Sequence, residues 1–538
     1  MNGLVLIISS IVFFIVGYKF WGNYVSRQLG IDETRKTPAE EINDGIDYVP
    51  TRPGVLVGHH FSSIAGAAPI IGPITAAYFG WIAVFLWIVL GGLFMGAVHD
   101  FSALVISIRH GGKSLGMVIE ERMGRTSKIL FLLFVYAALI LVISVFTNAV
   151  AVTFVKVPQT GTSSMIFMVI AIVFGLGVYR WNFNFIASTI LGIGFLGLAM
   201  YAGFLWPIKL SVNTWRVILL IYIFAASVLP VWLLLQPRDY LNSFILYAML
   251  FILVAGIIWV NPELKNTAKP VFSTPSGPLV PLLFVTVACG ALSGFHSLVS
   301  TGTTAKQLAS EAHAKPVGFG SMLIESLLAT GALITAAALT PEAFNQKFSS
   351  GAIPLFSSQS AKMASSLGIP FEFGRTFMSL AVAAFALTSL DTATRLGRFA
   401  VQELAYNPRS EKQNIIAQNR YVSTIITVIA GALMVFSGSD REIWPIFGSA
   451  NQLLAALSFL AITVWLIHRK KPSAFAAIPG VFIYFITMGA LGWNIYSFLK
   501  TGKLVLAGLA AILIILALFL GVEAVKVIRK KDEGSEIV

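Results

Sequence analysis

Apolar runs of roughly 20 residues, the length that crosses a bilayer as a helix, recur along the whole chain. Hydrophobic residues make up 57% of the 538 residues and charged residues 11%, whereas a soluble globular domain carries about 25% charged residues. The chain is therefore predicted to be an all-α polytopic membrane protein, a single integral membrane domain over 1–538. About fifteen spans are predicted, at 2–22, 59–80, 83–107, 128–155, 163–179, 183–206, 214–235, 240–260, 279–302, 317–340, 375–394, 421–437, 444–467, 474–498 and 504–525.

Loop charges predict the orientation of these spans. The first run has no basic residue before it and no small-residue cleavage site, so it is expected to be an anchor rather than a signal peptide. When the chain is threaded from outside, the larger share of its 37 Lys and Arg residues falls in inward loops. This asymmetry predicts a cytoplasmic C-terminus. The net charge of +13 is then a topology signal and does not indicate nucleic-acid binding.

Motif searches exclude several other classes. The single cysteine, Cys289, excludes an intrachain disulfide and a cysteine metal cluster. Because the Gly-x4-Gly-Lys-Ser/Thr signature of nucleotide binding does not occur, ATP-driven transport by this chain alone is not expected.

Two spans contain residues that break helices. Residues 58–66 read GHHFSSIAG and residues 294–302 read GFHSLVSTG, so both fit Gly-x-His-x5-Gly. Pro69 and Pro73 follow the first copy and each removes a backbone donor. Interrupted helices in two halves of a membrane protein indicate a transporter site, although small residues also simply let helices pack closely. The substrate-binding candidates are His60, Ser62, Ser63, Gly66, Gly294, His296, Ser297, Ser300, Thr301, Gly302 and Thr303.

Three carboxylates fall inside predicted spans. Asp100, Glu325 and Asp391 are costly in hydrocarbon unless they are protonated, paired or wetted, so they are the proton-coupling candidates. Asp391 equally fits a helical pair with Arg395 four residues on. Residues 237–239 (Pro-Arg-Asp), after the span at 214–235, are expected to form a charged turn on the inner face, with a structural role such as a helix cap or salt bridge.

The histidines leave more than one interpretation open. His59 is expected to lie at the interface in contact with water, whereas His60 and His296 fit either a binding site or a packing role. Adjacent histidines and the lack of His-Glu-x-x-His give no support for a metal site, and the spacing gives none for haem. Both Gly-x-His copies are predicted in the inner half of the membrane, level with Asp100 and Glu325, which weakens them as a sign of inversion.

Several longer blocks resemble the carbon starvation protein A family. The resemblance runs from about residue 40 to 405 and is looser beyond 420. The blocks are DGIDYVPT (44–51), GHHFSSIAGAAPIIGP (58–73), GAVHDFSALVIS (96–107), LPVWLLLQPRDYL (229–241), ACGALSGFHSLVSTGTTAKQLASE (288–311), GSMLIESLLA (320–329) and SLDTATRLGRF (389–399).

The resemblance implies an inner-membrane uptake protein made during nutrient limitation, which imports peptides or, in some members, pyruvate with protons. It also implies the amino acid–polyamine–cation superfamily, with two inverted repeats whose first helices are broken. The expected division is an accessory helix (1–22), a first repeat (59–206), an inserted hairpin (214–260), a second repeat (279–467) and accessory helices with the tail (474–538).

The sequence therefore predicts a secondary transporter in a bacterial or archaeal plasma membrane, with H⁺ as coupling ion and Na⁺ as the alternative. We expect a small carboxylated substrate, lipid contact, no cofactor, no enzyme activity and no nucleic-acid partner. A nutrient sensor is a second class, although sensors normally have a cytoplasmic output domain. A metal- or haem-binding membrane protein is a third.

Overall fold

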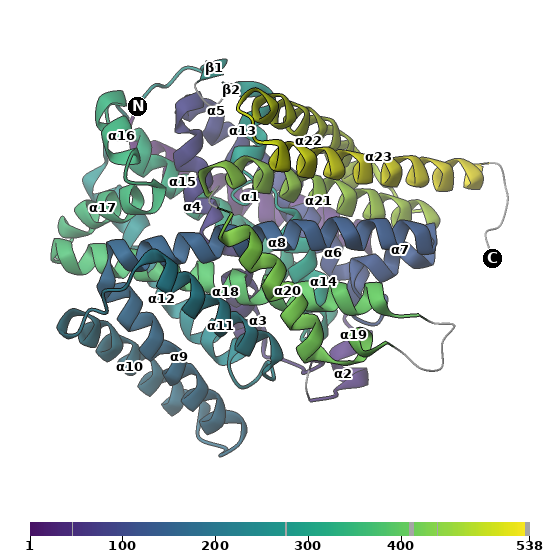
Figure 1. Cartoon of the computed structure of the whole chain (residues 1–538), viewed down its shortest axis with the longest axis horizontal. Helices are drawn as coiled ribbons and strands as arrows, with labels where there is room; N and C mark the ends of the chain where they lie inside the picture. Colours follow the sequence, from purple (N-terminus) through teal and green to yellow (C-terminus); the bar gives the residue numbers. More distant parts are fainter. Residues whose placement is uncertain (46, 275–276, 408–413, 438–439, 533–538) are drawn as a thin grey trace.

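The computed structural model describes residues 1–45, 47–274, 277–407, 414–437 and 440–532. Long helices run along the molecule, and the figure places α16 and α17 at its left end and α7 and α19 toward its right (Figure 1). A two-stranded antiparallel ribbon, β1 (Ser273–Thr274) with β2 (Gly277–Pro278), precedes α13. The all-helical expectation is confirmed.

Eleven helical segments of the described residues are long and apolar enough to cross a membrane, and one bent pair makes a twelfth. The eleven are α1 (Gly3–Leu29), α5 (Trp81–Leu86) with η2 (Trp87–Gly96) and α6 (Ala97–Ile108), α8 (Arg125–Lys156), α9 (Pro158–Tyr179), α10 (Phe185–Leu205), α12 (Leu235–Val260), η4 (Glu311–His313) with η5 (Lys315–Gly320) and α15 (Ser321–Ala337), α18 (Phe371–Ala405), α21 (Asp440–His468), α22 (Ala474–Lys500) and α23 (Leu504–Asp532).

The expected count of fifteen spans is not confirmed. Helices α11 (Val212–Val228) and α20 (Arg420–Val435) are apolar but shorter than a usual span, and the ninth predicted span is divided into two short helices. The remaining short helices are α2 (Pro38–Ile42), η1 (Ala77–Phe79), α7 (Leu115–Met123), η3 (Thr304–Lys306), α16 (Pro341–Phe348), α17 (Ala352–Ser365) and α19 (Ile415–Gln418).

The first predicted interruption lies between α3 (Pro53–Ala65) and α4 (Ala68–Ala76), which meet at a bend of 42°. Gly66 ends α3 with a φ of +47°, a conformation that an L side chain rarely adopts. A Cβ added at Gly66 would also lie 2.8 Å from Ser389 Oγ of α18. Because both strain and space oppose a side chain there, the break depends on glycine.

The second interruption separates α13 (Leu279–Thr286) from α14 (Gly294–Gly302). A Cβ added at Gly294 would lie 2.4 Å from the backbone oxygen of Asn451 and from the backbone nitrogen of Ala455, so α14 begins in close contact with α21. Asn451 Oδ1 also accepts a hydrogen bond of 2.9 Å from the backbone nitrogen of Phe295. One of the unpaired amides at the start of α14 is thereby satisfied by α21.

The helices around the two breaks pack in a matched way. The long helices α8 and α18 pack along each other, and α11 and α20 each pack against both of them and against one another. Helix α3 packs against α12 as α14 packs against α21, and α3 and α14 are themselves in contact. By contrast, α10 packs chiefly against α9 and α12, only 22% of its apolar stretch is buried, and the pair α9–α10 lies at the edge of the molecule (Figure 1).

Candidate functional site

A carboxylate and two imidazoles from distant segments meet beside the second break. His296 Nδ1 of α14 lies 2.8 Å from Asp100 Oδ2 of α6, and His99 Nδ1 lies 2.8 Å from Asp100 Oδ1. All three residues are fully buried. When Asp100 is ionised, each Nδ1 donates its hydrogen to the carboxylate, so Nε2 of each neutral ring is left as an acceptor.

Glu325 of α15 faces the other side of the His296 ring. Its Oε2 lies 3.4 Å from His296 Nε2, and neither carboxyl oxygen of Glu325 has a hydrogen-bond partner within the described residues. Because His296 Nδ1 donates to Asp100, an attractive contact at Nε2 requires one more proton, carried either by Glu325 or by the imidazole. Asp100, His296 and Glu325, here called the central cluster, can therefore hold and pass a proton.

Two members of the central cluster, together with Cys289, also meet the distance condition for a metal ion. Cys289, His296 and Glu325 each offer a ligand atom, and these atoms lie within 4.8 Å of one another. The Cys289 thiol, however, already donates to Ser293 Oγ at 3.5 Å and accepts from Asn451 Nδ2 at 3.5 Å. A protonated and hydrogen-bonded set satisfies the same distances, so the geometry does not require a metal.

His60 links the first interrupted helix to the chain that follows the second. Its Nδ1 lies 2.8 Å from the Thr304 hydroxyl in η3. The ring is fully buried, and its Nε2 has no hydrogen-bond partner in the part of the chain that the structure describes. Burying an imidazole nitrogen without a hydrogen-bond partner costs free energy. A bound ligand could supply the missing partner.

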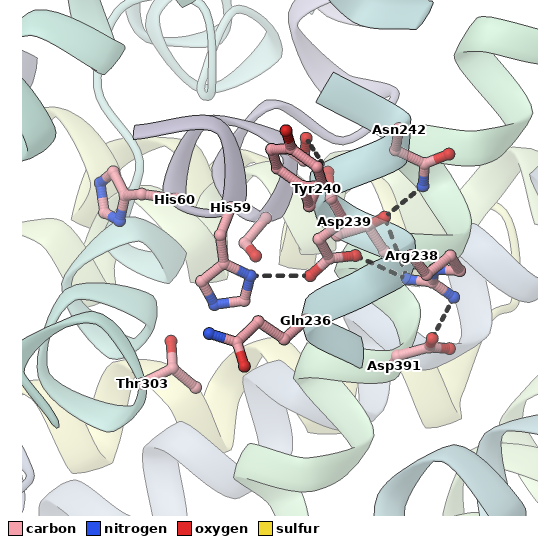
Figure 2. A network of polar contacts seen from close by, with 12 residues as sticks. His59, His60, Gln236, Arg238, Asp239, Tyr240, Asn242, Thr303 and Asp391 are labelled. Carbon is pink, nitrogen blue, oxygen red and sulfur yellow. Dashed lines mark hydrogen bonds and ion pairs between the residues drawn. The ribbon is translucent and has the colours of Figure 1, made fainter. Parts of the chain in front are cut away.

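A second polar network lies on another side of α3, around His59. Figure 2 shows dashed contacts that join His59 to Asp239, Asp239 to Arg238 and Arg238 to Asp391, with His60 pointing away from them. His59 Nδ1 lies 3.0 Å from Asp239 Oδ2, and Tyr222 donates a hydrogen bond of 2.6 Å to Asp391 Oδ2. These five residues, the arginine network, join α3, α11, α12 and α18 through buried charge.

Several sequence expectations for this network are wrong. Arg238 is not in a turn on the surface: it lies in the first turn of α12 and is fully buried. His59 is buried rather than interfacial. Asp391 pairs with Arg238 and not with Arg395. Arg395 instead pairs with Asp47, with 3.6 Å between Arg395 Nη1 and Asp47 Oδ1. Proline is tolerated in a first helical turn, so Pro-Arg-Asp begins the helix instead of ending one.

Most of the predicted hydroxyl groups bond to backbone. Thr301 donates to Ser297 O at 2.8 Å and Thr303 to Val299 O at 2.9 Å, one turn earlier in each case. Ser300 Oγ lies 3.5 Å from Asp100 O. Ser62 donates to Asp239 O at 3.3 Å, and Ser297 contacts Gly294 O at 2.7 Å and Ser458 at 2.8 Å. The Ser63 hydroxyl is buried without a partner among the described residues, whereas its backbone oxygen accepts from Ser389 at 3.1 Å.

A pocket of about 280 Å³ opens at the end of the molecule near α7 and extends to the C-terminal end of α14. Thr301 and Gly302 line it, together with Lys306 and Glu403. Lys306 Nζ lies 5.4 Å from the ring centre of Tyr48 and 5.0 Å from that of Phe399. Burial lowers the pKa of Lys306 from its ordinary value.

The structure brings together Asp100, His296 and Glu325, and it places Asp391 in the separate arginine network. His60 of α3 points away from the arginine network (Figure 2), and its Nδ1 contacts Thr304. The sequence did not identify Arg238 or Asn451 as site neighbours. For Arg238 a signal existed, because an Arg-Asp pair inside an apolar stretch requires a buried partner.

Comparison with known proteins gives a consistent set of matches. The family model for carbon starvation protein CstA matches residues 2–371 and 346–490. The peptide transporter CstA of Campylobacter jejuni is 33% identical over 568 residues, covering 90% of this chain and 79% of that protein. The peptide transporter CstA of Bacillus subtilis is 32% identical, covering 98% and 97%. The pyruvate/proton symporter BtsT of Escherichia coli is 31% identical, covering 92% and 82%.

Among solved structures, a histidine-to-alanine variant of the manganese transporter from Eremococcus coleocola has a similar fold. The TM-score is 0.52 at 12% sequence identity, over 90% of this chain and 99% of that one. At this identity the likeness concerns the fold alone.

Proposed function

Because the chain belongs to the carbon starvation protein CstA family, we propose that it is a secondary transporter that imports peptides, pyruvate or both across the plasma membrane, coupled to protons. The observation that carries the proposal is the buried central cluster beside two interrupted helices. The C-terminus is cytoplasmic in this proposal, in accord with the loop charges. Na⁺ is the alternative coupling ion.

Proton coupling follows from the order of groups in the central cluster. A proton that reaches Glu325 can pass to Nε2 of His296, while Nδ1 of the same ring delivers its hydrogen to Asp100. Two negative charges next to one imidazole are unfavourable in a site without water, so the cluster is most stable when it holds a proton. Any movement of α14 relative to α6 or α15 would change that preference.

The substrate in this proposal binds at the two breaks. Helix α14 begins at Gly294 and directs the positive end of its dipole toward the break, which favours a carboxylate there. The unpartnered Nε2 of His60 offers a further contact. The proposed binding residues are those of the sequence prediction: His60, Ser62, Ser63, Gly66, Gly294, His296, Ser297, Ser300, Thr301, Gly302 and Thr303.

Helix contacts favour a division of the repeats that differs from the sequence expectation. Helix α3 packs against α12 as α14 packs against α21, α12 packs against α18 as α21 packs against α8, and α8 packs against α11 as α18 packs against α20. We therefore propose one repeat of α3/α4, α5–α6, α8, α11 and α12, and another of α13/α14, α15, α18, α20 and α21. In this division the peripheral pair α9–α10 is the insertion, and residues 214–260 belong to the first repeat.

We propose that the arginine network has a structural role and does not exchange the coupling proton. Arg238 neutralises Asp391, so we assign proton exchange to Asp100 and Glu325 and a structural role to Asp391. The network would hold α3, α12 and α18 together while the central cluster changes its protonation.

Reconstituted protein tests the proposal. Uptake of pyruvate or dialanine should respond to an imposed pH gradient, with separate H⁺ and Na⁺ gradients identifying the ion. Absence of both uptake and counterflow would favour a sensor. An optical spectrum and metal analysis of the purified protein would reveal haem or a metal; the proposal requires no cofactor and no enzyme activity.

A further inference from the structure

Two adjoining hollows open at the end of the molecule where α16 and α17 lie, opposite the pocket near α7 (Figure 1). Their volumes are about 160 and 240 Å³, and both are lined by Lys156, Ser350 and Ser379. The smaller one reaches Ile71 of α4, beyond the first break. We call the pair the outer vestibule, since the loop charges place this end outside.

The outer vestibule is strongly basic. Lys156, Lys347 and Arg375 line the larger hollow. Lys362 lies beside Lys347: burial lowers the pKa of Lys347, and the positive charge of Lys362 lowers it further. Glu372 neutralises part of this charge through a 2.6 Å contact between its Oε2 and Arg375 Nη2. Two adjacent lysines repel each other unless an anion lies between them.

Unpartnered donors also point to a ligand. Ser357 lines the larger hollow and is 1% exposed, yet its hydroxyl has no hydrogen-bond partner among the described residues. Arg375 Nε is likewise buried without a partner in this part of the structure. A serine hydroxyl, an arginine and lysine ammonium groups are the donors that bind a carboxylate.

Helix α18 runs from the outer vestibule, past the first break, to the pocket near α7. Ser379 lines the vestibule, Ser389 contacts Ser63 next to the first break, and Phe399 lines the pocket near α7. Ser379, Ser389 and Phe399 are spaced ten residues apart, so the two openings lie about 30 Å apart along α18. This distance is about the thickness of a hydrocarbon core, and the first break lies midway along it.

We propose that the outer vestibule is a first binding site for the carboxylate group of the substrate, which Lys347, Lys362, Arg375 and Ser357 hold before it reaches the first break. This inference rests on the proposed function for its direction and substrate class. The lysines raise the local concentration of anionic substrate and its rate of association, and salt screens that effect.

The test compares vestibule variants with a matched control in proteoliposomes. The double variant Lys347→Gln/Lys362→Gln and the single variant Arg375→Gln should each raise the KM for pyruvate and dialanine about five- to tenfold at low salt, with kcat within about twofold. Lys362→Glu should have a larger effect. The control Lys265→Gln removes a half-exposed lysine of the same outer loops and should leave KM unchanged.

Two further measurements test whether the effect on KM is electrostatic and requires a carboxylate. High salt should remove the difference between wild type and variants, and dialanine amide, which lacks a carboxylate, should compete equally with both. An unchanged KM in the double variant would overturn the inference and leave the proposed function standing.

Binding is also measured without transport, from saturation transfer to pyruvate in NMR. If wild type binds pyruvate through the vestibule lysines but moves nothing, the proposed function fails and the inference stands. If it neither transports nor binds a carboxylate, both fail.

Discussion

His296 Nδ1 of α14 lies 2.8 Å from Asp100 Oδ2 of α6, a contact that joins residues 196 positions apart in a fully buried site. The contact makes the protonation of the cluster depend on how α14 is placed, and α14 begins at the second break. In the proposed function, proton binding and substrate binding would therefore both involve α14.

Replacing Asp100 should separate transport from its driving force. Asp100→Asn keeps the size of the side chain but removes the charge that orders the His296 ring. We expect gradient-driven accumulation to fall at least about tenfold while counterflow stays within about threefold. Exposed Glu263→Gln is the control. Undiminished gradient-driven uptake by Asp100→Asn would remove Asp100 from the coupling role.

Loss of Arg238 should destabilise the fold. Arg238→Met leaves Asp391 buried without its cation, and breaking one side of a buried pair costs about 3–5 kcal/mol. The double variant Arg238→Met/Asp391→Leu removes both charges of this pair, leaves Asp239 with its His59 contact, and should recover part of the loss. Thermal unfolding in detergent measures both. The comparison Lys526→Met breaks an exposed pair with Glu523 and should cost less than about 1 kcal/mol. Equal stability of the single and double variants would contradict this account.

A methyl group at Gly294 should displace α14 from α21. Its Cβ would meet backbone atoms at 2.4 Å, and overpacking of this kind costs about 1–3 kcal/mol. We expect Gly294→Ala to lower both melting temperature and uptake. Gly492→Ala is the matched control, because nothing lies within 4 Å of the added atom and alanine favours a helix more than glycine. If both variants behave alike, the contact with α21 does not position α14.

Lys306, partly buried in the pocket near α7, should make stability depend on pH. Burial lowers the pKa of Lys306 below its ordinary value of 10.5 in the folded protein, so the folded state disfavours the charged form. Lys306→Met should therefore unfold at a higher temperature than wild type near pH 7. The difference should shrink as the pH rises through the folded pKa toward 10.5, since wild type then loses the charge. If the difference in unfolding temperature between Lys306→Met and wild type did not change with pH, it would arise from packing and not from the charge of Lys306.

The sequence predicted the parts of the site that depend on local chemistry. Glycines and prolines located both interruptions, and the depth of Asp100, His296 and Glu325 within their spans predicted that they would meet. Both predictions use distances along single helices, which the rise per residue fixes.

The partners across helices could not be predicted in the same way. The pairing of Arg238 with Asp391 spans 153 residues and depends on how α12 packs against α18. Helices α9–α10 and residues 214–260 are similarly apolar, so hydropathy alone does not say which pair lies at the edge. Thr301 and Thr303 have their hydroxyl groups bonded one turn back in the helix, an option open to any threonine in a helix.

Proton-coupled import is tested by measuring substrate flux and proton flux at the same time. Purified wild-type protein is reconstituted into vesicles with a trapped pH indicator and a clamped membrane potential, and radiolabelled pyruvate or dialanine is added outside. The account predicts that the substrate accumulates above its external concentration under an inward proton gradient, and that its addition acidifies the lumen. Substrate uptake without any proton movement, under a gradient of either sign, would contradict it.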